Sequence, residues 1–181
     1  MKATGIVRRI DDLGRVVIPK EIRRTLQIRE SDPLEIFTDQ DGGIVLKKFS
    51  PIGELSHHAK HYTDSLAQVT GNVVAIADRE KIIAVSGGLR TLMDRRLSRE
   101  VVERLDNRET WQAGRDERNF ARIVTDYAET YVWETVVPIL CEGDVVGAVI
   151  MLATDIRSRM GEQELKLAQT AAGFFGRQME Q

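Results

Sequence analysis

The chain has 181 residues, of which 42% are apolar and 30% are charged, and its formal net charge is −2. This length suits one medium domain or two small ones, and the composition excludes a disordered or fibrous protein. The longest apolar run, residues 145–153, is shorter than the roughly 20 residues of a transmembrane helix. Charges at residues 8–12 interrupt any signal peptide, so we expect a cytoplasmic protein. The single cysteine, Cys141, excludes an internal disulfide framework.

The charges are unevenly distributed along the chain. Residues 1–29 hold eight basic and three acidic side chains, a net charge of +5, so the remaining 152 residues carry −7. A basic end on an acidic body is expected when one end binds phosphates. Without further evidence the same charges could form an ordinary solvated surface.

The first elements are short. Runs of β-branched residues predict strands at residues 5–10 and 15–18, with a turn at residues 11–14 between them. Pro19 is suited to the start of a helix because its missing N–H would be unpaired there, and a brief helix is expected over residues 20–26.

Alternating apolar residues then predict a β-hairpin. Its strands are residues 33–38 and 44–49, and residues 39–43 form the turn. A unit of about fifty residues buries little apolar surface, so residues 1–50 are expected to dimerise.

A larger domain, residues 56–181, is predicted after a short linker at residues 51–55. Its expected elements are a helix at 55–69, a hairpin of 72–78 and 81–86, a charged helical region at 89–106, paired strands at 132–140 and 145–153 within the strand-rich stretch 122–155, and a final helix at 162–179. Both long helices carry an apolar stripe with residues three and four apart. Pairing these stripes between chains would make a tetramer from two dimers.

Residues 10–24, with the sequence IDDLGRVVIPKEIRR, resemble the signature of the AbrB transition-state regulators. The resemblance covers residues 1–50 and implies that two chains exchange hairpins to build one dimeric β-barrel, whose arginines bind double-stranded DNA. The overall fold class expected is α+β, a swapped-hairpin β-barrel followed by a second α/β domain. The positions that match the DNA-contacting arginines are Arg8, Arg15, Arg23 and Arg24, and weaker candidates are Lys2, Arg9 and Lys20.

The predicted helix supports this interpretation independently of the family. At about 100° per residue, Lys20, Arg23 and Arg24 lie on one side, while Ile22 and Leu26 lie on the other. The helix can therefore pack on a barrel and still present three cations to phosphates or base edges. Some arginines are expected to pair instead with Asp11, Asp12 or Glu21. No helix-turn-helix pattern is present, which favours recognition of DNA shape, with tolerance for A·T-rich sequences.

The order of elements in residues 56–181 resembles a GAF domain, which implies a pocket for a small effector. Ser86, Gly87 and Gly88, together with Trp111 and Trp133, could line such a pocket, although aromatic residues of this kind are more often core. The motif of cyclic-nucleotide-binding members is missing.

Other sites are less well supported. His57, His58 and His61 have the spacing of metal ligands on a helix but lack a third partner from elsewhere, so a solvated face is the better interpretation. Ser86 in AVSGG is similar to a nucleophile elbow, yet every histidine precedes it, which excludes that hydrolase triad. No motif for a cofactor or metal is present, and neither an enzyme nor a cofactor is expected.

The sequence therefore predicts a DNA-binding transcription regulator that, by the resemblance, activates some genes and represses others during spore formation. The alternative is an antitoxin of the MazE type, which uses a similar small barrel to regulate its own promoter. Such proteins continue into a disordered tail that wraps a toxin, and the strand-rich texture of residues 55–181 argues against one.

Overall fold

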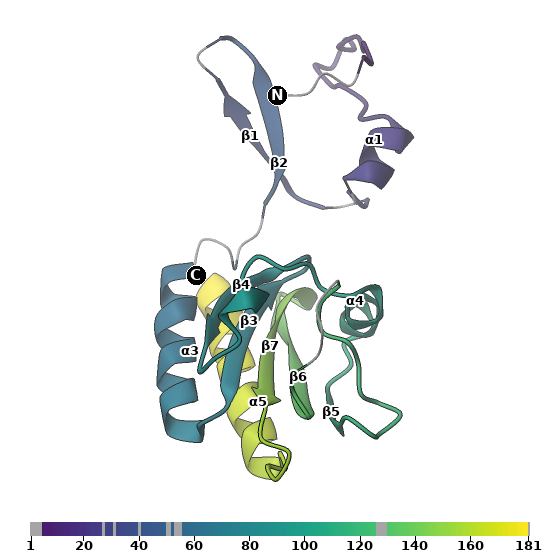
Figure 1. Ribbon diagram of the computed structural model, residues 1–181. Helices are drawn as coiled ribbons and strands as arrows, with labels where there is room; N and C mark the ends of the chain where they lie inside the picture. Colours follow the sequence, from purple (N-terminus) through teal and green to yellow (C-terminus); the bar gives the residue numbers. More distant parts are fainter. Residues whose placement is uncertain are drawn as a thin grey trace. The chain divides into compact units, whose positions relative to one another are not determined.

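The computed structural model describes residues 5–26, 28–30, 32–39, 41–49, 52, 56–125 and 130–180, without the side chains of Ser56 and His57. The chain divides into two compact units, Met1–Phe49 and Ser50–Gln181, each of which is described by itself (Figure 1). Both units combine helix and sheet, so the α+β class is confirmed. Most of the expected linker, residues 51–55, lies outside the described residues.

The first unit contains one short helix and one hairpin. Helix α1 is Lys20–Thr25, and strands β1 (Leu34–Thr38) and β2 (Ile44–Lys48) pair antiparallel with Ile36 opposite Leu46. The Asp39 carboxylate organises the hairpin turn by accepting hydrogen bonds from the N–H groups of Asp41 at 3.1 Å and Gly43 at 2.6 Å. Helix and hairpin begin and end within one residue of the predicted bounds.

Two expected strands do not form within this chain. Residues 5–10 and 15–18 have no strand assignment, and the hydrogen bond from Asp11 N–H to Arg15 O, at 3.0 Å, joins them only beside the turn. A β-strand is defined by a paired neighbour, and the apolar periodicity of a segment does not say which chain supplies that neighbour.

The second unit is built on a five-stranded antiparallel sheet in the order β4-β3-β7-β6-β5. The strands are β3 (Val73–Asp78), β4 (Ile82–Ser86), β5 (Trp111–Gly114), β6 (Trp133–Cys141) and β7 (Asp144–Ala153). The two hairpins that the sequence predicts, β3-β4 and β6-β7, are both confirmed.

Helices cover both faces of this sheet (Figure 1). Helices α3 (Ser56–Thr70) and α5 (Glu162–Met179) lie on one face, and α4 (Arg99–Asp106) lies on the other. Side chains alternate along each strand, so β3 sends Val74 and Ile76 toward α3 and α5, and sends Val73 and Ala75 toward α4. The sheet therefore separates two apolar cores.

The charged region at residues 89–106 is not one helix. Leu89 adopts a left-handed φ of 44°, a 3₁₀ turn spans Arg90–Leu92, and α4 begins only after Ser98, whose Oγ accepts a hydrogen bond from Val101 N–H at 3.2 Å. This serine is an ordinary helix N-cap.

Helix α5 approaches strand β6 very closely through a glycine. A Cβ atom built on Gly176 would lie 2.2 Å from the carbonyl oxygen of Leu140, a distance that no real contact allows. On the outer side of the same helix, a Cβ on Gly173 would meet only the end of the Arg177 side chain, at 3.9 Å. Gly176 therefore sets the distance between α5 and the sheet.

The apolar stripe of α5 serves the core of its own chain. Ala168, Ala172 and Phe175 are buried against the sheet. The sheet of the same chain therefore covers the middle of this stripe, and Leu165 and Met179 at its ends are half-buried. The large apolar side chains that remain exposed on the two long helices are Val69 and Phe174.

Candidate nucleic-acid interface

The turn at residues 11–14 is organised by the carboxylate of Asp11. Its Oδ1 accepts hydrogen bonds from the backbone N–H groups of Leu13 at 3.0 Å and Arg15 at 2.7 Å. Gly14 closes the turn by donating to Asp11 O, and its φ of 75° favours glycine. These hydrogen bonds, that from Arg15 N–H foremost, hold the pKa of Asp11 below its ordinary value. One acidic side chain therefore determines the conformation of this turn.

Arg15 projects from this turn and forms an ion pair with Asp11, with 2.9 Å between Nε and Oδ2. One of the arginines thus pairs with a neighbouring acid, as the sequence suggests. The pair engages Nε, and the guanidinium carries further N–H donors that can bond a phosphate or a guanine edge. The arginine side chain is still 68% exposed. Asp11 therefore orients Arg15 and leaves it at the surface.

Helix α1 presents its cations to solvent. Lys20, Arg23 and Arg24 are all exposed, and the preceding Pro19 is buried. Pro19 also accepts the first helical hydrogen bond, from Arg23 N–H at 3.0 Å. Ile22 is half-buried, but Leu26, expected to pack the helix onto the barrel, is 56% exposed in the single chain.

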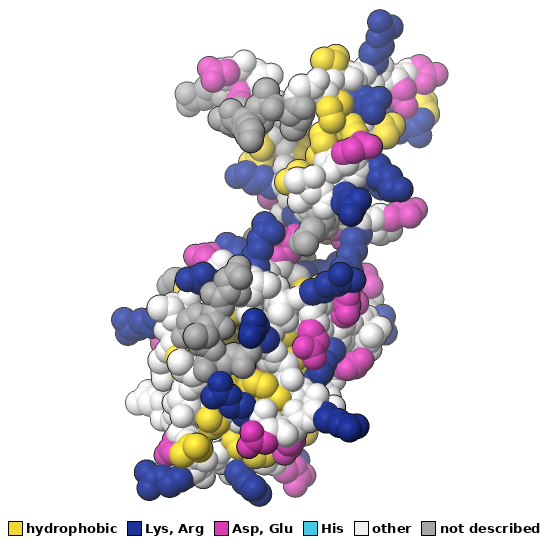
Figure 2. Space-filling view, turned by 45° about the vertical axis from the view of Figure 1, so that its right-hand side comes forward, with side chains coloured by type: hydrophobic (Ala, Val, Ile, Leu, Met, Phe, Trp, Pro, Cys, Tyr) yellow, Lys and Arg dark blue, Asp and Glu magenta, His cyan; other side chains and the backbone are white. Residues whose placement is uncertain are grey.

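The remaining candidates flank the same region. Arg8 and Arg9 are exposed in the extended segment before the turn, and Lys2 lies outside the described residues. Figure 2 shows basic and hydrophobic side chains next to one another on the surface of the unit that carries α1. The first unit therefore offers a basic surface, and its individual contacts to DNA remain predictions.

The first unit also exposes most of its large apolar side chains. Val7 is 90% exposed, Val17 72%, and on one face of the hairpin Ile36 and Ile44 are 67% and 71% exposed. So many exposed large apolar side chains in one small unit usually mark a protein interface. The basic surface thus belongs to a unit whose core is incomplete in one chain.

Comparison with known proteins identifies the family to which this chain belongs. The model of the family "Stage V sporulation protein T C-terminal, transcription factor" matches residues 54–180. Stage V sporulation protein T of Bacillus subtilis is 51% identical over 181 residues, which cover 100% of both chains. This chain belongs to the stage V sporulation protein T family.

Within this stage V sporulation protein T homologue, residues 1–49 have their own relatives. The transition state regulatory protein AbrB of Bacillus subtilis is 65% identical over 51 residues, which cover 28% of this chain and 52% of AbrB. The family model "Antidote-toxin recognition MazE, bacterial antitoxin" matches residues 7–53. The resemblance to AbrB that the sequence predicts is confirmed.

The second unit has the fold of a GAF domain. A GAF domain of an Acinetobacter phosphoenolpyruvate-protein phosphotransferase superposes with a TM-score of 0.58 at 14% identity, covering 69% of this chain and 81% of that one. A methyl-accepting chemotaxis protein fragment also gives 0.58, at 12% identity, covering 69% of this chain and 88% of its own. These likenesses establish the fold alone.

The pocket suggested for this domain does not form from the residues that the sequence singles out. Trp111 faces α4, whereas Ser86 and Trp133 belong to the opposite face of the sheet, where Ser86 Oγ hydrogen-bonds Thr63 Oγ1 at 2.8 Å and Asp64 Oδ1 at 2.6 Å. Strand alternation separates the two tryptophans, and sequence spacing between strands cannot reveal this.

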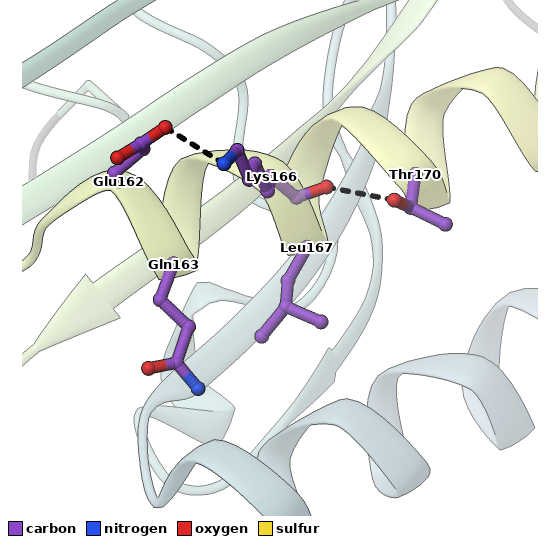
Figure 3. A pocket seen from close by; sticks show the side chains of 5 residues that line it. All are labelled: Glu162, Gln163, Lys166, Leu167 and Thr170. Carbon is purple, nitrogen blue, oxygen red and sulfur yellow. Dashed lines mark hydrogen bonds and ion pairs between the residues drawn. The ribbon is translucent and has the colours of Figure 1, made fainter.

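A hollow on the surface of α5 is lined by one helix alone (Figure 3). Its lining includes Lys166 and Glu162, which form an ion pair with 2.7 Å between Nζ and Oε1, and the apolar side chain of Leu167. No second element contributes a convergent polar group to this lining. In the described part of the chain, no three metal-ligating side chains gather either, and no helix there is long and apolar enough to cross a membrane.

One residue with unusual chemistry is not among those that the sequence singles out. Glu134 is fully buried on β6 and accepts a hydrogen bond from Trp111 Nε1 at 2.8 Å. The signal available in the sequence is a single acid within the otherwise apolar and uncharged run YVWETVVPIL.

Proposed function

We propose that this chain is a DNA-binding transcription regulator of sporulation genes, with residues 1–50 as its DNA-binding domain. Membership of a family described as a transcription factor supports the regulatory role. The observation that carries the DNA-binding role is the exposed set of cations on α1 and beside the Asp11 turn, in a segment 65% identical to AbrB over 51 residues.

DNA is read in this proposal by shape and by scattered arginine contacts. Helix α1 has six residues, too few to fill a major groove as a recognition helix does. Arg8, Arg15, Arg23 and Arg24 contact phosphates and base edges, and Lys2, Arg9 and Lys20 add charge around them. Deformable A·T-rich DNA is therefore the expected target.

Selection of genomic DNA fragments on the full-length protein tests the function. Sequencing of the retained fragments should reveal enriched promoters, among them promoters of sporulation genes. Retention of fragments in proportion to their length alone would mean that the basic surface binds DNA without reading it, and the proposal would fail.

We propose that residues 1–50 form a dimer in which exchanged hairpins complete one barrel, and the exposed apolar side chains of the first unit support this. Light scattering on a 1–53 fragment should give twice the monomer mass at micromolar concentration, because the side chains of Ile36 and Ile44 are buried only between two chains. A folded monomer of this fragment would contradict the dimer.

A tetramer of the full chain is the next level of assembly that we propose. Val69 on α3 is 80% exposed and Phe174 on α5 is 38% exposed, and pairing these helices between chains would cover both. Light scattering should give a tetramer, and Val69→Lys should reduce it to a dimer. A wild-type dimer would show that α3 and α5 serve only their own sheet.

The second unit is proposed to assemble the protein and to sense a small effector. An effector regulates DNA binding only if it binds two states of the protein unequally. We expect the protein to act without catalysis and to be located in the cytoplasm.

An antitoxin of the MazE type is the alternative, favoured by the family match over residues 7–53. The folded second unit supports the regulator instead, because an antitoxin tail orders only on its toxin.

A further inference from the structure

Glu134 lies where an acidic side chain is costly. Of the described acidic residues, it is the one with no exposed surface. It projects from β6 toward the α4 face of the sheet, and its cross-strand neighbours are Ala113 on β5 and Leu152 on β7. Neither neighbour can compensate a charge, so the carboxyl group depends on the few polar groups around it.

The two carboxyl oxygens of Glu134 differ in their surroundings. Oε1 accepts hydrogen bonds from Trp111 Nε1 at 2.8 Å and from Ala121 N–H at 2.7 Å. Oε2 is buried and has no hydrogen-bond partner among the described residues. Burial, the largest influence, raises the pKa of Glu134 to about 7 despite these donors. The carboxyl group of Glu134 therefore loses its proton near neutrality and not in the ordinary acidic range.

The charged groups that act on Glu134 come from α4. Arg104 favours the ionised form and Glu100 opposes it, and the two pair with each other at 2.6 Å between Nη2 and Oε1. Arg104 also donates from Nη1 to Asn119 O at 2.7 Å, and its guanidinium lies 5.1 Å from the centre of the Trp111 ring. Arg104 is therefore already committed to other partners.

The same groups fasten one loop to the domain. Residues 115–125 follow β5, and Glu134 binds this loop at Ala121 N–H while Arg104 binds it at Asn119 O. The hydroxyl of Tyr131 adds a third attachment by accepting from Ile123 N–H at 3.0 Å. Backbone hydrogen bonds from Ser98 N–H to Ile123 O at 2.9 Å and from Thr125 N–H to Arg96 O at 3.0 Å hold the end of the loop without Glu134. The part of the loop that depends on Glu134 and Arg104 is therefore residues 116–122.

We propose that Glu134 is a proton-controlled clamp that holds residues 116–122 closed when it is protonated and releases them when it is ionised. Ionisation spreads a negative charge over both carboxyl oxygens, and none of the described residues donates a hydrogen bond to Oε2. This buried negative charge is stabilised if water enters past the loop, or if Arg104 breaks its hydrogen bond to Asn119 O and donates to Oε2 instead. Both movements loosen the loop, so the second unit has two states whose balance follows pH, and a ligand that prefers one state is coupled to protons.

Fluorine NMR of the full chain, labelled with 5-fluorotryptophan, tests the titration. The chain has two tryptophans, and Trp133→Phe assigns the resonances. We expect the Trp111 resonance to shift with a midpoint at about pH 7, and Glu134→Gln to remove that shift, because the amide keeps the acceptor for Trp111 but cannot ionise. Glu117→Gln, at an exposed acid in the same loop, should leave it unchanged. A wild-type Trp111 resonance that does not move between about pH 5 and about pH 9 overturns the proposal.

Hydrogen exchange tests the movement itself. An acid with a higher pKa in the closed state binds its proton more tightly there, so opening becomes easier as pH rises. After correction for intrinsic rates, the opening equilibrium of residues 116–122 should rise by up to about tenfold per pH unit between about pH 5 and about pH 7, and then level off. Glu134→Gln should flatten this dependence. Equal dependence in the wild type and in Glu134→Gln would show that the loop does not respond to this carboxyl group.

Discussion

Replacement of Arg23 and Arg24 by alanine should abolish tight DNA binding and leave the fold intact. Both side chains are exposed on α1, so their removal opens no cavity. Each arginine contact to a base is worth about 1–3 kcal/mol, and a dimer makes each contact twice. If the arginines bind phosphates, removing each such contact should also reduce the salt slope of log affinity by about 0.9. Fluorescence anisotropy with a selected promoter fragment, repeated at several salt concentrations, measures both quantities.

Arg157→Ala is the matched control for this experiment, because the Arg157 side chain is 89% exposed and lies in the second unit. It should bind DNA as the wild type does. Unfolding curves of all variants should coincide. If the double variant kept its affinity and its salt slope, Arg23 and Arg24 would be surface charges without a role in recognition.

Replacement of Gly176 by alanine should strongly destabilise the second unit. The new methyl group would meet the carbonyl oxygen of Leu140 at 2.2 Å, and backbone cannot move aside as a flexible side chain can. Helix α5 must then shift away from β6, at a cost of about 1–3 kcal/mol, the range typical of overpacking. Both tryptophans belong to this unit, so tryptophan fluorescence in urea follows its unfolding.

Gly173→Ala makes the same chemical change on the open side of α5, where the nearest atom is 3.9 Å away. It should stabilise the helix by about 1 kcal/mol, since alanine loses less backbone freedom than glycine. Opposite signs for the two variants are the expected result. Similar values would mean that α5 does not rest on β6 through Gly176.

The parts of the fold that the sequence predicts well are those with local causes. The hairpin of β1 and β2 is specified by Asp39 and the two glycines beside it, and α1 by Pro19 and the residues that follow. The cations of α1 are exposed for the same reason, because a helical period alone places them opposite Ile22.

The parts that it misses depend on distant segments. Strand β5, Trp111–Gly114, has four residues, too few for a pattern to be recognised, and exists because β6 pairs with it. The charged helical region expected over residues 89–106 divides into a 3₁₀ turn, Arg90–Leu92, and helix α4, Arg99–Asp106, with non-helical residues between them. The burial of Glu134 follows from the sheet order, which brings Trp111 opposite β6. A local sequence pattern predicts none of these three features.

The apolar surface of residues 1–49 has a consequence for how the DNA-binding unit responds to protein supply. Its folding is a second-order process if another chain completes its core, so its stability rises with the logarithm of protomer concentration. Dilution alone should then unfold the first unit. The second unit should stay folded, because both of its apolar cores are formed within one chain. Under this mass-action rule, DNA binding would switch on steeply as protein accumulates, without any modification or ligand.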